Sequence, residues 1–257
     1  MSRLISPLQE AIHKQTAKEI ISEKIISLIA SGILQLGDEL PGERELAAML
    51  SVSRETVRGA IQWLAGQGVV QVSQGARTRV ARVDVDVDAQ RIGVTNAKAI
   101  NGYDLAAVHG ARLLVEKAVV ADAATCIGDD DIARLESSLE AQEGASDDPV
   151  RFLICDREFH LTIYYAASNR LLTDFVVDLY TYMLDQRRTA MSRPGAIRRS
   201  LDDHIAIVNA LKARDPAAVS AAFEQHIKRI YDTTRAVGAG EIPAPVRHLA
   251  RRGKKED

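Results

Sequence analysis

The stretch LPGERELAAMLSVSRETVRGAIQWLAGQGVV, residues 40–70, predicts two short helices separated by a polar turn. The first helix is expected over residues 43–50. The second begins after Ser53, whose side-chain oxygen can cap it. In this second helix the apolar residues recur at the spacing of one buried face, namely Val57, Ala60, Ile61 and Leu64. The helix is expected to end at Gly66-Gln67-Gly68.

Sequence on both sides extends this pair into a larger unit. A third helix is expected upstream, over residues 16–31, because apolar residues again follow one face. Downstream, the alternating runs VVQVS and RTRVA are separated by Gln-Gly-Ala at residues 74–76. A glycine-containing turn between alternating runs predicts a β-hairpin. Helix, turn, helix and hairpin together form the layout of a winged helix-turn-helix.

The exposed face of the second helix carries side chains suited to DNA: Arg54, Glu55, Thr56, Arg58 and Gln62. Its N-terminus presents free backbone N–H groups and the positive end of the helix dipole. Arginine and threonine can reach base edges and phosphates. The hairpin adds Gln74, Arg77 and Arg79 beside Gly75. A small helical domain with a merely polar surface is the alternative interpretation, but the hairpin and the basic bias favour DNA binding.

The same residues resemble the DNA-binding domain of GntR-family transcription regulators over roughly residues 13–81. The resemblance implies that Arg44, in the ER-x-L-A motif, contacts DNA, and that Gly75 at the hairpin tip enters the minor groove. It also implies contacts from the S-R-x-T-V-R stretch, at Ser53, Arg54, Thr56 and Arg58.

Two departures from the family pattern limit what carries over. The hairpin usually reads G-x-G-T-F-V, whereas here Arg77 and Arg79 replace the second glycine and the aromatic residue. Extra charge at these positions favours phosphate contacts. Glu55 stands where a small or neutral residue is common, and it can accept from a cytosine amino group or pair with Arg58. The operator sequence therefore does not carry over from the family.

Composition sets the broad class of the whole chain. The 257 residues fit two domains. Hydrophobic residues make up 46% and aromatic residues only 4%, which favours helix packing over a β-sandwich. The net charge of −2 excludes a uniformly basic coat, but residues 1–82 hold 10 Lys/Arg against 8 Asp/Glu, while residues 83–246 are acidic. Only one part of the chain is therefore expected to meet a polyanion.

The predicted fold is mainly α, in two domains. Residues 1–81 are expected to form the winged helix-turn-helix of three helices and a hairpin. Residues 82–101 form a linker or an edge strand, residues 102–237 form an all-helical bundle of about six helices, and residues 238–257 form a basic tail, either disordered or clamping DNA. No apolar run is long enough to cross a bilayer, and no signal peptide is expected. Two cysteines without metal or redox spacing indicate buried, reduced thiols and a cytoplasmic protein.

Five polar residues fall on the apolar, inward faces of the bundle helices: Arg112, Asp156, His160, His204 and His226. Burying such a group without a partner costs several kcal/mol, so each of these residues needs a partner. One interpretation is a set of core histidines bonded to backbone carbonyls. The other is a metal site, since three imidazoles and one carboxylate suit Zn, Ni, Mn or Fe, with Zn or Ni favoured, and do not suit Ca or Mg.

The spacing D-x3-H, followed by a histidine on each of two later helices, resembles the FCD effector-binding domain of the FadR branch of GntR regulators, over roughly residues 102–237. The resemblance implies that Asp156, His160, His204 and His226 hold a divalent transition metal. It also implies that Arg112, in the R-x3-E motif, binds the carboxylate of a small organic acid. The expected protein is a homodimer that binds a pseudo-palindromic operator on double-stranded DNA and responds to that acid.

Two other functions remain open at this point. An open metal site can activate water, so a hydrolase-like enzyme fused to a DNA-binding module is one alternative. The other is a regulator whose metal is purely structural and which senses no small molecule. The attached DNA-binding module argues against the enzyme.

Overall fold

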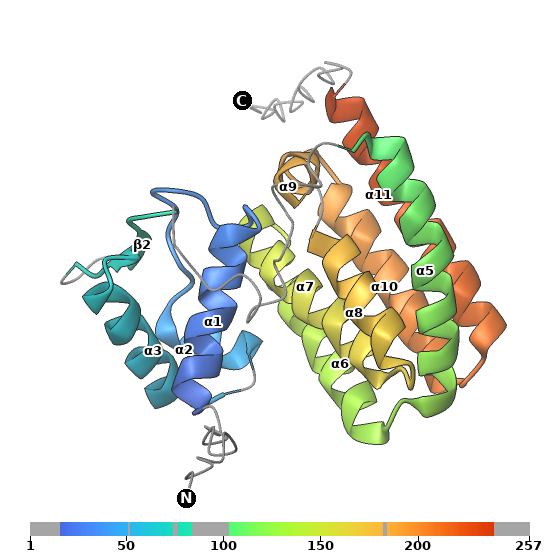
Figure 1. The fold of residues 1–257 in the computed structure, drawn as a ribbon, viewed down its shortest axis with the longest axis horizontal. Coiled ribbons are helices and arrows are strands. Elements are labelled where there is room, and N and C mark those ends of the chain that lie inside the picture. The colour runs from blue at the N-terminus through green and yellow to red at the C-terminus, as the bar shows by residue number, and fades with distance from the viewer. Residues whose placement is uncertain (1–15, 51, 74–76, 84–102, 182–183, 239–257) are drawn as a thin grey trace, which may run out of the picture.

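The computed structural model describes residues 16–50, 52–73, 77–83, 103–181 and 184–238. It shows a small N-terminal unit beside a larger helical bundle (Figure 1). The N-terminal unit contains α1 (Ala17–Ala30), α2 (Glu43–Met49) and α3 (Arg54–Gly66). Thr16 caps α1 by accepting a hydrogen bond from the backbone N–H of Glu19, whose carboxylate in turn accepts from the N–H of Thr16. All three helices were expected from the sequence.

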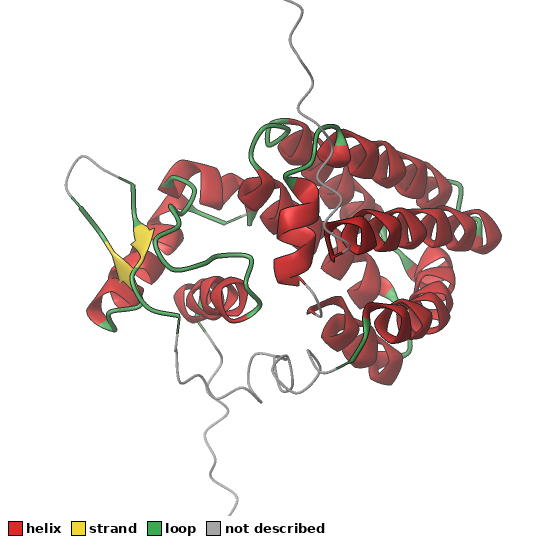
Figure 2. Cartoon of the chain, turned by 90° about the horizontal axis from the view of Figure 1, so that it is seen from above, coloured by secondary structure: helices red, strands yellow, loops and turns green. Residues whose placement is uncertain are grey.

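The hairpin follows α3 as predicted, although its paired strands are short. β1 (Val70–Gln71) pairs antiparallel with β2 (Arg79–Val80), with Val70 opposite Val80. The segment before α2 joins this sheet through a bridge between Glu39 and Arg79. Seen from above, the strands lie at the end of the N-terminal unit far from the bundle (Figure 2). The tip residues Gln74 and Gly75, the linker over residues 84–101 and the tail over residues 239–257 lie outside the described residues.

The C-terminal bundle has seven helices among the described residues, against about six expected. They are α5 (Leu105–Cys126), α6 (Asp129–Glu143), α7 (Pro149–Ala166), α8 (Arg170–Thr181), α9 (Leu184–Met191), α10 (Ala196–Lys212) and α11 (Pro216–Gly238). Helix α5 runs beside α11 at one side of the bundle, and α7 lies on the side that faces α1 (Figure 1). Across the described residues, no helix is both long and apolar enough to span a bilayer.

The bundle interior is mainly apolar, and its buried ionisable residues gather mostly at one centre. Leucine, isoleucine, valine and phenylalanine side chains fill the space between the helices. The five inward polar residues predicted from the sequence are all buried, at 5% exposure for Arg112 and 0% for the other four. The prediction of two buried cysteines is half right: Cys155 is buried, whereas Cys126 lies exposed at the end of α5.

Polar contacts join the N-terminal unit to the bundle. Lys24 on α1 forms an ion pair with Glu158 on α7, and Arg157 on α7 donates to Ser27 Oγ on α1 at 3.1 Å. Arg151 at the start of α7 pairs with Glu45 on α2. A fourth contact comes from α9, where Arg188 pairs with Asp38. Charged and hydroxyl groups therefore form part of the interface between the two units.

Candidate metal centre and nucleic-acid interface

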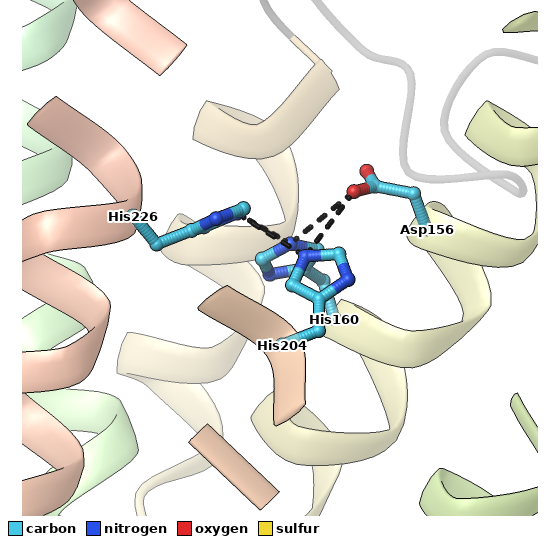
Figure 3. A group of neighbouring side chains, drawn as sticks. All are labelled: Asp156, His160, His204 and His226. Carbon is cyan, nitrogen blue, oxygen red and sulfur yellow. Dashed lines mark hydrogen bonds and ion pairs between the residues drawn. The ribbon is translucent and has the colours of Figure 1, made fainter. Parts of the chain in front are cut away.

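Three helices bring four candidate metal ligands together in the bundle core (Figure 3). Asp156 and His160 lie one turn apart on α7, so their side chains project to the same side. His204 comes from α10 and His226 from α11. All four side chains are 0% exposed. The sequence prediction that these residues converge is therefore confirmed by their positions.

Four of the six pairs of donor atoms have separations close to those in a small metal site. Oδ1 of Asp156 lies 3.7 Å from Nε2 of His160 and 3.4 Å from Nε2 of His204. Nε2 of His226 lies 3.2 Å from Nε2 of His160 and 3.4 Å from Nε2 of His204. Ligands about 2.0–2.1 Å from a zinc ion in tetrahedral geometry are roughly 3.3 Å apart. These four residues could hold a metal ion, as all the donor atoms lie within 4.8 Å of one another.

The outer nitrogen of His204 has a partner that fixes its tautomer. Nδ1 of His204 lies 2.6 Å from Oε1 of Gln142 on α6. The amide nitrogen of Gln142 donates to Ser138 Oγ at 3.3 Å, which identifies the oxygen as the atom facing the imidazole. Since an amide oxygen only accepts, Nδ1 of His204 carries the proton. Its Nε2 therefore directs a lone pair at the centre.

The outer nitrogen of His160 also has a hydrogen-bond partner, whereas that of His226 has only a nearby carboxylate. Nδ1 of His160 lies 3.2 Å from the hydroxyl of Tyr164, and that hydroxyl donates its only proton to Glu116 at 2.9 Å. The tyrosine oxygen must therefore accept from Nδ1 of His160. A carboxylate oxygen of Asp203 lies 3.5 Å from Nδ1 of His226. Such outer partners orient the imidazoles of metal sites and make them better donors.

Asp156 divides its two oxygens between the centre and the surrounding bundle. Oδ2 accepts from the hydroxyl of Tyr180 and, at 2.8 Å, from Nη2 of Arg187. Oδ1 is buried without a hydrogen-bond partner and faces the imidazoles. Burial is the largest single effect and opposes ionisation, but the Arg187 guanidinium and the other groups around the carboxylate together outweigh it and lower the pKa of the Asp156 carboxyl below its ordinary value. An anionic oxygen therefore faces the Nε2 atoms of three imidazoles, and a cation between these four atoms would satisfy all of them.

Burial also keeps two of the imidazoles, those of His160 and His204, in the neutral form. It lowers the pKa of His204 to about 3 and, as the main cause, places the pKa of His160 well below its ordinary value. Neutral imidazole is the form that binds metal. The donor set of three nitrogens and one oxygen suits a first-row transition ion.

Arg112 lies next to this centre, linked to it by a chain of contacts. It forms a buried ion pair with Glu116, one helical turn along α5. Glu116 accepts from Tyr164, which contacts His160. Nη2 of Arg112 has no hydrogen-bond partner. The sequence analysis placed Arg112 on the inward face, but it missed Gln142, Tyr164, Tyr180 and Arg187. Tyr164 lies four residues after His160 on the same helix, a spacing that could have indicated it, whereas no spacing relates the other three residues to the ligands.

The proposed DNA-reading face of α3 is exposed and partly pre-ordered. Nε of Arg54 and Nη2 of Arg58 lie 3.2 and 3.1 Å from the same carboxylate oxygen of Glu43 on α2. Arg58 also lies 3.6 Å from Glu55, one of the two partners considered for that carboxylate. Ser53 Oγ accepts from the backbone N–H of Thr56, so Ser53 caps α3 as predicted.

The other predicted DNA contacts differ in their surroundings. Arg44 is exposed on α2. Arg77 lies 3.9 Å from Glu45, which is at the limit of an ion pair. Arg79 pairs with Glu39 and donates to the carbonyl of Gly37 at 3.1 Å, so it would have to leave these partners to reach a phosphate. Gln74 and Gly75 lie outside the described residues.

Comparison with known proteins finds a matching family for each of the two domains. Residues 17–80 match the family of bacterial regulatory proteins of the gntR type, and residues 107–229 match the FCD domain. The HTH-type transcriptional repressor NanR of Klebsiella aerogenes is 29% identical over 90% of this chain and 90% of its own length. NanR of Salmonella schwarzengrund is 29% identical over 88% of this chain and 87% of its own length.

A solved structure supports the fold. Escherichia coli McbR/YncC superposes with a TM-score of 0.52 at 20% identity, covering 87% of this chain and 99% of its own. The two domain matches follow one another along the chain and cover most of the winged unit and of the bundle. They identify a transcription regulator rather than an enzyme. The chain belongs to the GntR family of bacterial regulatory proteins and joins a winged helix-turn-helix DNA-binding domain to an FCD domain.

Proposed function

We propose that this protein is a cytoplasmic, metabolite-responsive repressor that binds a pseudo-palindromic operator as a homodimer. The repressor names of its NanR relatives support the direction of control. The exposed basic face of α3 supports operator reading through Arg54 and Arg58, with Arg44, Ser53, Thr56 and the hairpin residues Gln74, Gly75, Arg77 and Arg79 contributing further contacts. A dimer would present two such faces to successive half-sites about one helical turn apart.

We further propose that the bundle senses a small carboxylic acid through a divalent transition metal, with Zn or Ni favoured. Asp156, His160, His204 and His226 would hold the ion, which supplies positive charge and Lewis acidity when bound. Arg112 would bind the carboxylate of the acid, since guanidinium and carboxylate match in a bidentate geometry. Acid binding would change the free energy of DNA binding by ~1–3 kcal/mol.

One observation carries this proposal. The Nε2 lone pairs of His160 and His204 and the unpartnered Oδ1 of Asp156 converge with Nε2 of His226 within a buried core. Without a cation, Nε2 of His226 can donate to only one of the two facing lone pairs, so the other lone pair and Oδ1 of Asp156 stay buried without a partner, which is costly in a low-dielectric interior. Nδ1 of His204 donates to Gln142 and Nδ1 of His160 donates to Tyr164, which holds these two imidazoles in this orientation.

The test combines metal and acid binding. The full chain is freed of metal with a chelator and titrated with Zn²⁺ in a calorimeter. The zinc-loaded and metal-free forms are then titrated with acetate, lactate, succinate and citrate. The proposal expects about one zinc per chain and a carboxylate that binds only when both zinc and Arg112 are present. Equal binding to the metal-free form and to Arg112→Gln would overturn the sensing role.

The complete burial of the four ligands favours a second candidate, in which the metal is purely structural. Structural zinc sites are closed by four protein ligands, as this donor set could be. This candidate expects the same zinc stoichiometry and a loss of thermal stability on chelation. It expects no heat from any of the four acids and no effect of these acids on DNA binding.

A further inference from the structure

A small cavity next to the metal centre contains more hydrogen-bond donors than the protein satisfies. It lies between α5, α9 and α11 and has a volume of about 20 Å³, room for little more than one water molecule. Arg112, Arg187 and Thr234 line it, together with apolar side chains and the stacked rings of His109 and Tyr231. The sequence analysis assigned a ligand role to Arg112 alone.

Each of the three polar lining residues has a buried atom without a partner. These atoms are Nη2 of Arg112, Nε and Nη1 of Arg187, and Oγ1 of Thr234. The three residues are only 5%, 2% and 2% exposed. Buried donors without partners are uncommon and costly in folded proteins. A ligand that belongs in this cavity must therefore supply several acceptor oxygens.

The charges around the cavity also favour an anionic ligand. Glu116 offsets Arg112, and Asp156 offsets Arg187. A divalent cation at Asp156 would add two positive charges to this balanced set. A carboxylate is larger than the present cavity, so the lining helices would have to move apart to admit it; once inside, it would reduce that excess and meet two guanidinium groups at once.

Arg187 stands between the metal centre and the cavity. Its Nη2 holds Oδ2 of Asp156 at 2.8 Å, its guanidinium lies over the ring of Tyr180 at 4.8 Å, and its other two nitrogens are free to donate. A ligand that recruits those nitrogens would pull on the same guanidinium that orients a metal ligand. Binding in the cavity would therefore move α9, which carries Arg187, or change the position of Asp156.

The next residue on α9 contacts the DNA-binding unit. Nη2 of Arg188 lies 3.0 Å from Oδ1 of Asp38, and Nη1 donates to the carbonyl of Ile33 at 3.2 Å. Asp38 belongs to the segment that pairs with β2, because the N–H of Val80 donates to its carbonyl at 2.9 Å. Adjacent residues of one eight-residue helix therefore contact the metal centre and the segment beside the hairpin.

We propose that Arg187 and Thr234 complete, with Arg112, the binding site for the carboxylic acid, and that α9 transmits its occupancy to the hairpin through the Arg188–Asp38 ion pair. This inference rests on the proposed function, since it assumes that an acid is sensed. It assigns the ligand a carboxylate held by two guanidiniums. A second oxygen, such as a hydroxyl or keto group, lies within reach of Thr234.

The binding half is tested by calorimetry on the zinc-loaded full chain with acetate, lactate, succinate and citrate. Thr234→Val removes one hydroxyl while keeping the shape of the side chain, so the fold is preserved. Arg187→Lys keeps the charge beside Asp156. Both variants should bind lactate or citrate roughly tenfold or more weakly, as expected when a hydrogen bond to a charged group is lost. Ser200→Ala is the matched control, because Ser200 also has a buried hydroxyl without a partner but does not line this cavity.

The role of α9 in transmitting acid binding to the hairpin is tested with Arg188→Gln, because Arg188 does not line the cavity. DNA affinity is measured with and without the acid on a fragment that the wild-type chain selects from a random-sequence pool. The variant should bind the acid within about twofold of wild type, yet the acid should no longer change its DNA affinity. The charge exchange Arg188→Asp with Asp38→Arg should restore part of the response.

The outcomes separate this inference from the proposed function. If none of the acids, including acetate as the smallest carboxylate, binds the zinc-loaded wild type, both this inference and the acid sensing in the proposed function are wrong. If acids bind the wild type, Arg187→Lys and Thr234→Val equally, the assigned site falls while acid sensing stands. If Arg188→Gln keeps the full acid response on DNA, the role of α9 falls.

Discussion

The amide oxygen of Gln142 lies 2.6 Å from Nδ1 of His204, and this single contact decides which nitrogen of that imidazole faces the centre of the bundle. Gln142 is itself 0% exposed and comes from α6, a helix that contributes none of the four candidate ligands. A residue outside the ligand set therefore controls the chemistry of one member of it.

Gln142→Leu should weaken metal binding without removing a ligand. Loss of the acceptor frees the tautomer of His204 and leaves its Nδ1–H unpaired, and changes of this kind typically cost about 10–100-fold in metal affinity. Competition with a coloured chelator measures the zinc dissociation constant. Ser138→Ala, which removes only the contact beyond Gln142, should change it far less. An unchanged affinity in Gln142→Leu would show that the amide does not orient the imidazole.

The metal-free protein should lose stability as the pH falls from 7 to 5. Burial lowers the pKa of His204 to about 3, against 6.5 in the unfolded chain. Between these values the unfolded state binds a proton that the native state does not, so the free energy of unfolding decreases as pH decreases, by at most about 1.4 kcal/mol per pH unit for one imidazole. Urea midpoints of chelator-treated protein at the two pH values measure this effect. Because the pKa of His160 is lowered as well, His204→Gln removes one of two titrating imidazoles and should make the dependence less steep; an equally steep loss in that variant would assign the effect elsewhere.

Arg58→Ala should weaken selective operator binding while leaving the fold intact. If Arg58 contacts a base edge, the cost is ~1–3 kcal/mol on the selected operator, with little change on unrelated DNA. Fluorescence anisotropy on both DNAs measures the ratio. Arg134→Ala, an exposed arginine on α6, serves as the control and should leave both affinities unchanged. A uniform loss on both DNAs in Arg58→Ala would make it a phosphate contact instead.

Arg79→Ala should weaken binding to all DNA sequences and flatten the salt dependence. One lost phosphate contact reduces the slope of log affinity against log salt by ~0.9. Because Arg79 pairs with Glu39 in this structure, Glu39→Gln should free the arginine and strengthen DNA binding. A salt series on the wild type and both variants provides the comparison. If the slope is unchanged in Arg79→Ala, Arg79 does not contact a phosphate and does not belong to the proposed interface.

The sequence predicted the helices and the ligands because both depend on local periodicity. Asp156 and His160 are four residues apart, so a helix places them side by side, and His204 and His226 lie on apolar stripes of their own helices. The burial of Arg112 followed from the same reasoning.

The surroundings of the ligands could not be predicted in this way. Arg187 and Gln142 reach the centre only because α9 and α6 pack against α7 and α10, and their own helices show no stripe that singles them out. The extra helix has a similar cause, since α9 is short and polar and gives a weak periodic signal. Exposure of Cys126 depends on the end of α5 lying at the surface of the bundle. Each of these features is set by packing between helices rather than by order along one helix.

The central claim is that Asp156, His160, His204 and His226 bind a transition ion, and elemental analysis of the purified full chain tests it most directly. The account predicts about one equivalent of Zn, Ni, Mn or Fe per chain in the wild type. It predicts loss of that metal in His226→Ala, whose continued folding is checked by cooperative unfolding. Wild-type protein that unfolds cooperatively, binds its operator and contains no transition ion, even after incubation with zinc and nickel, would contradict the account.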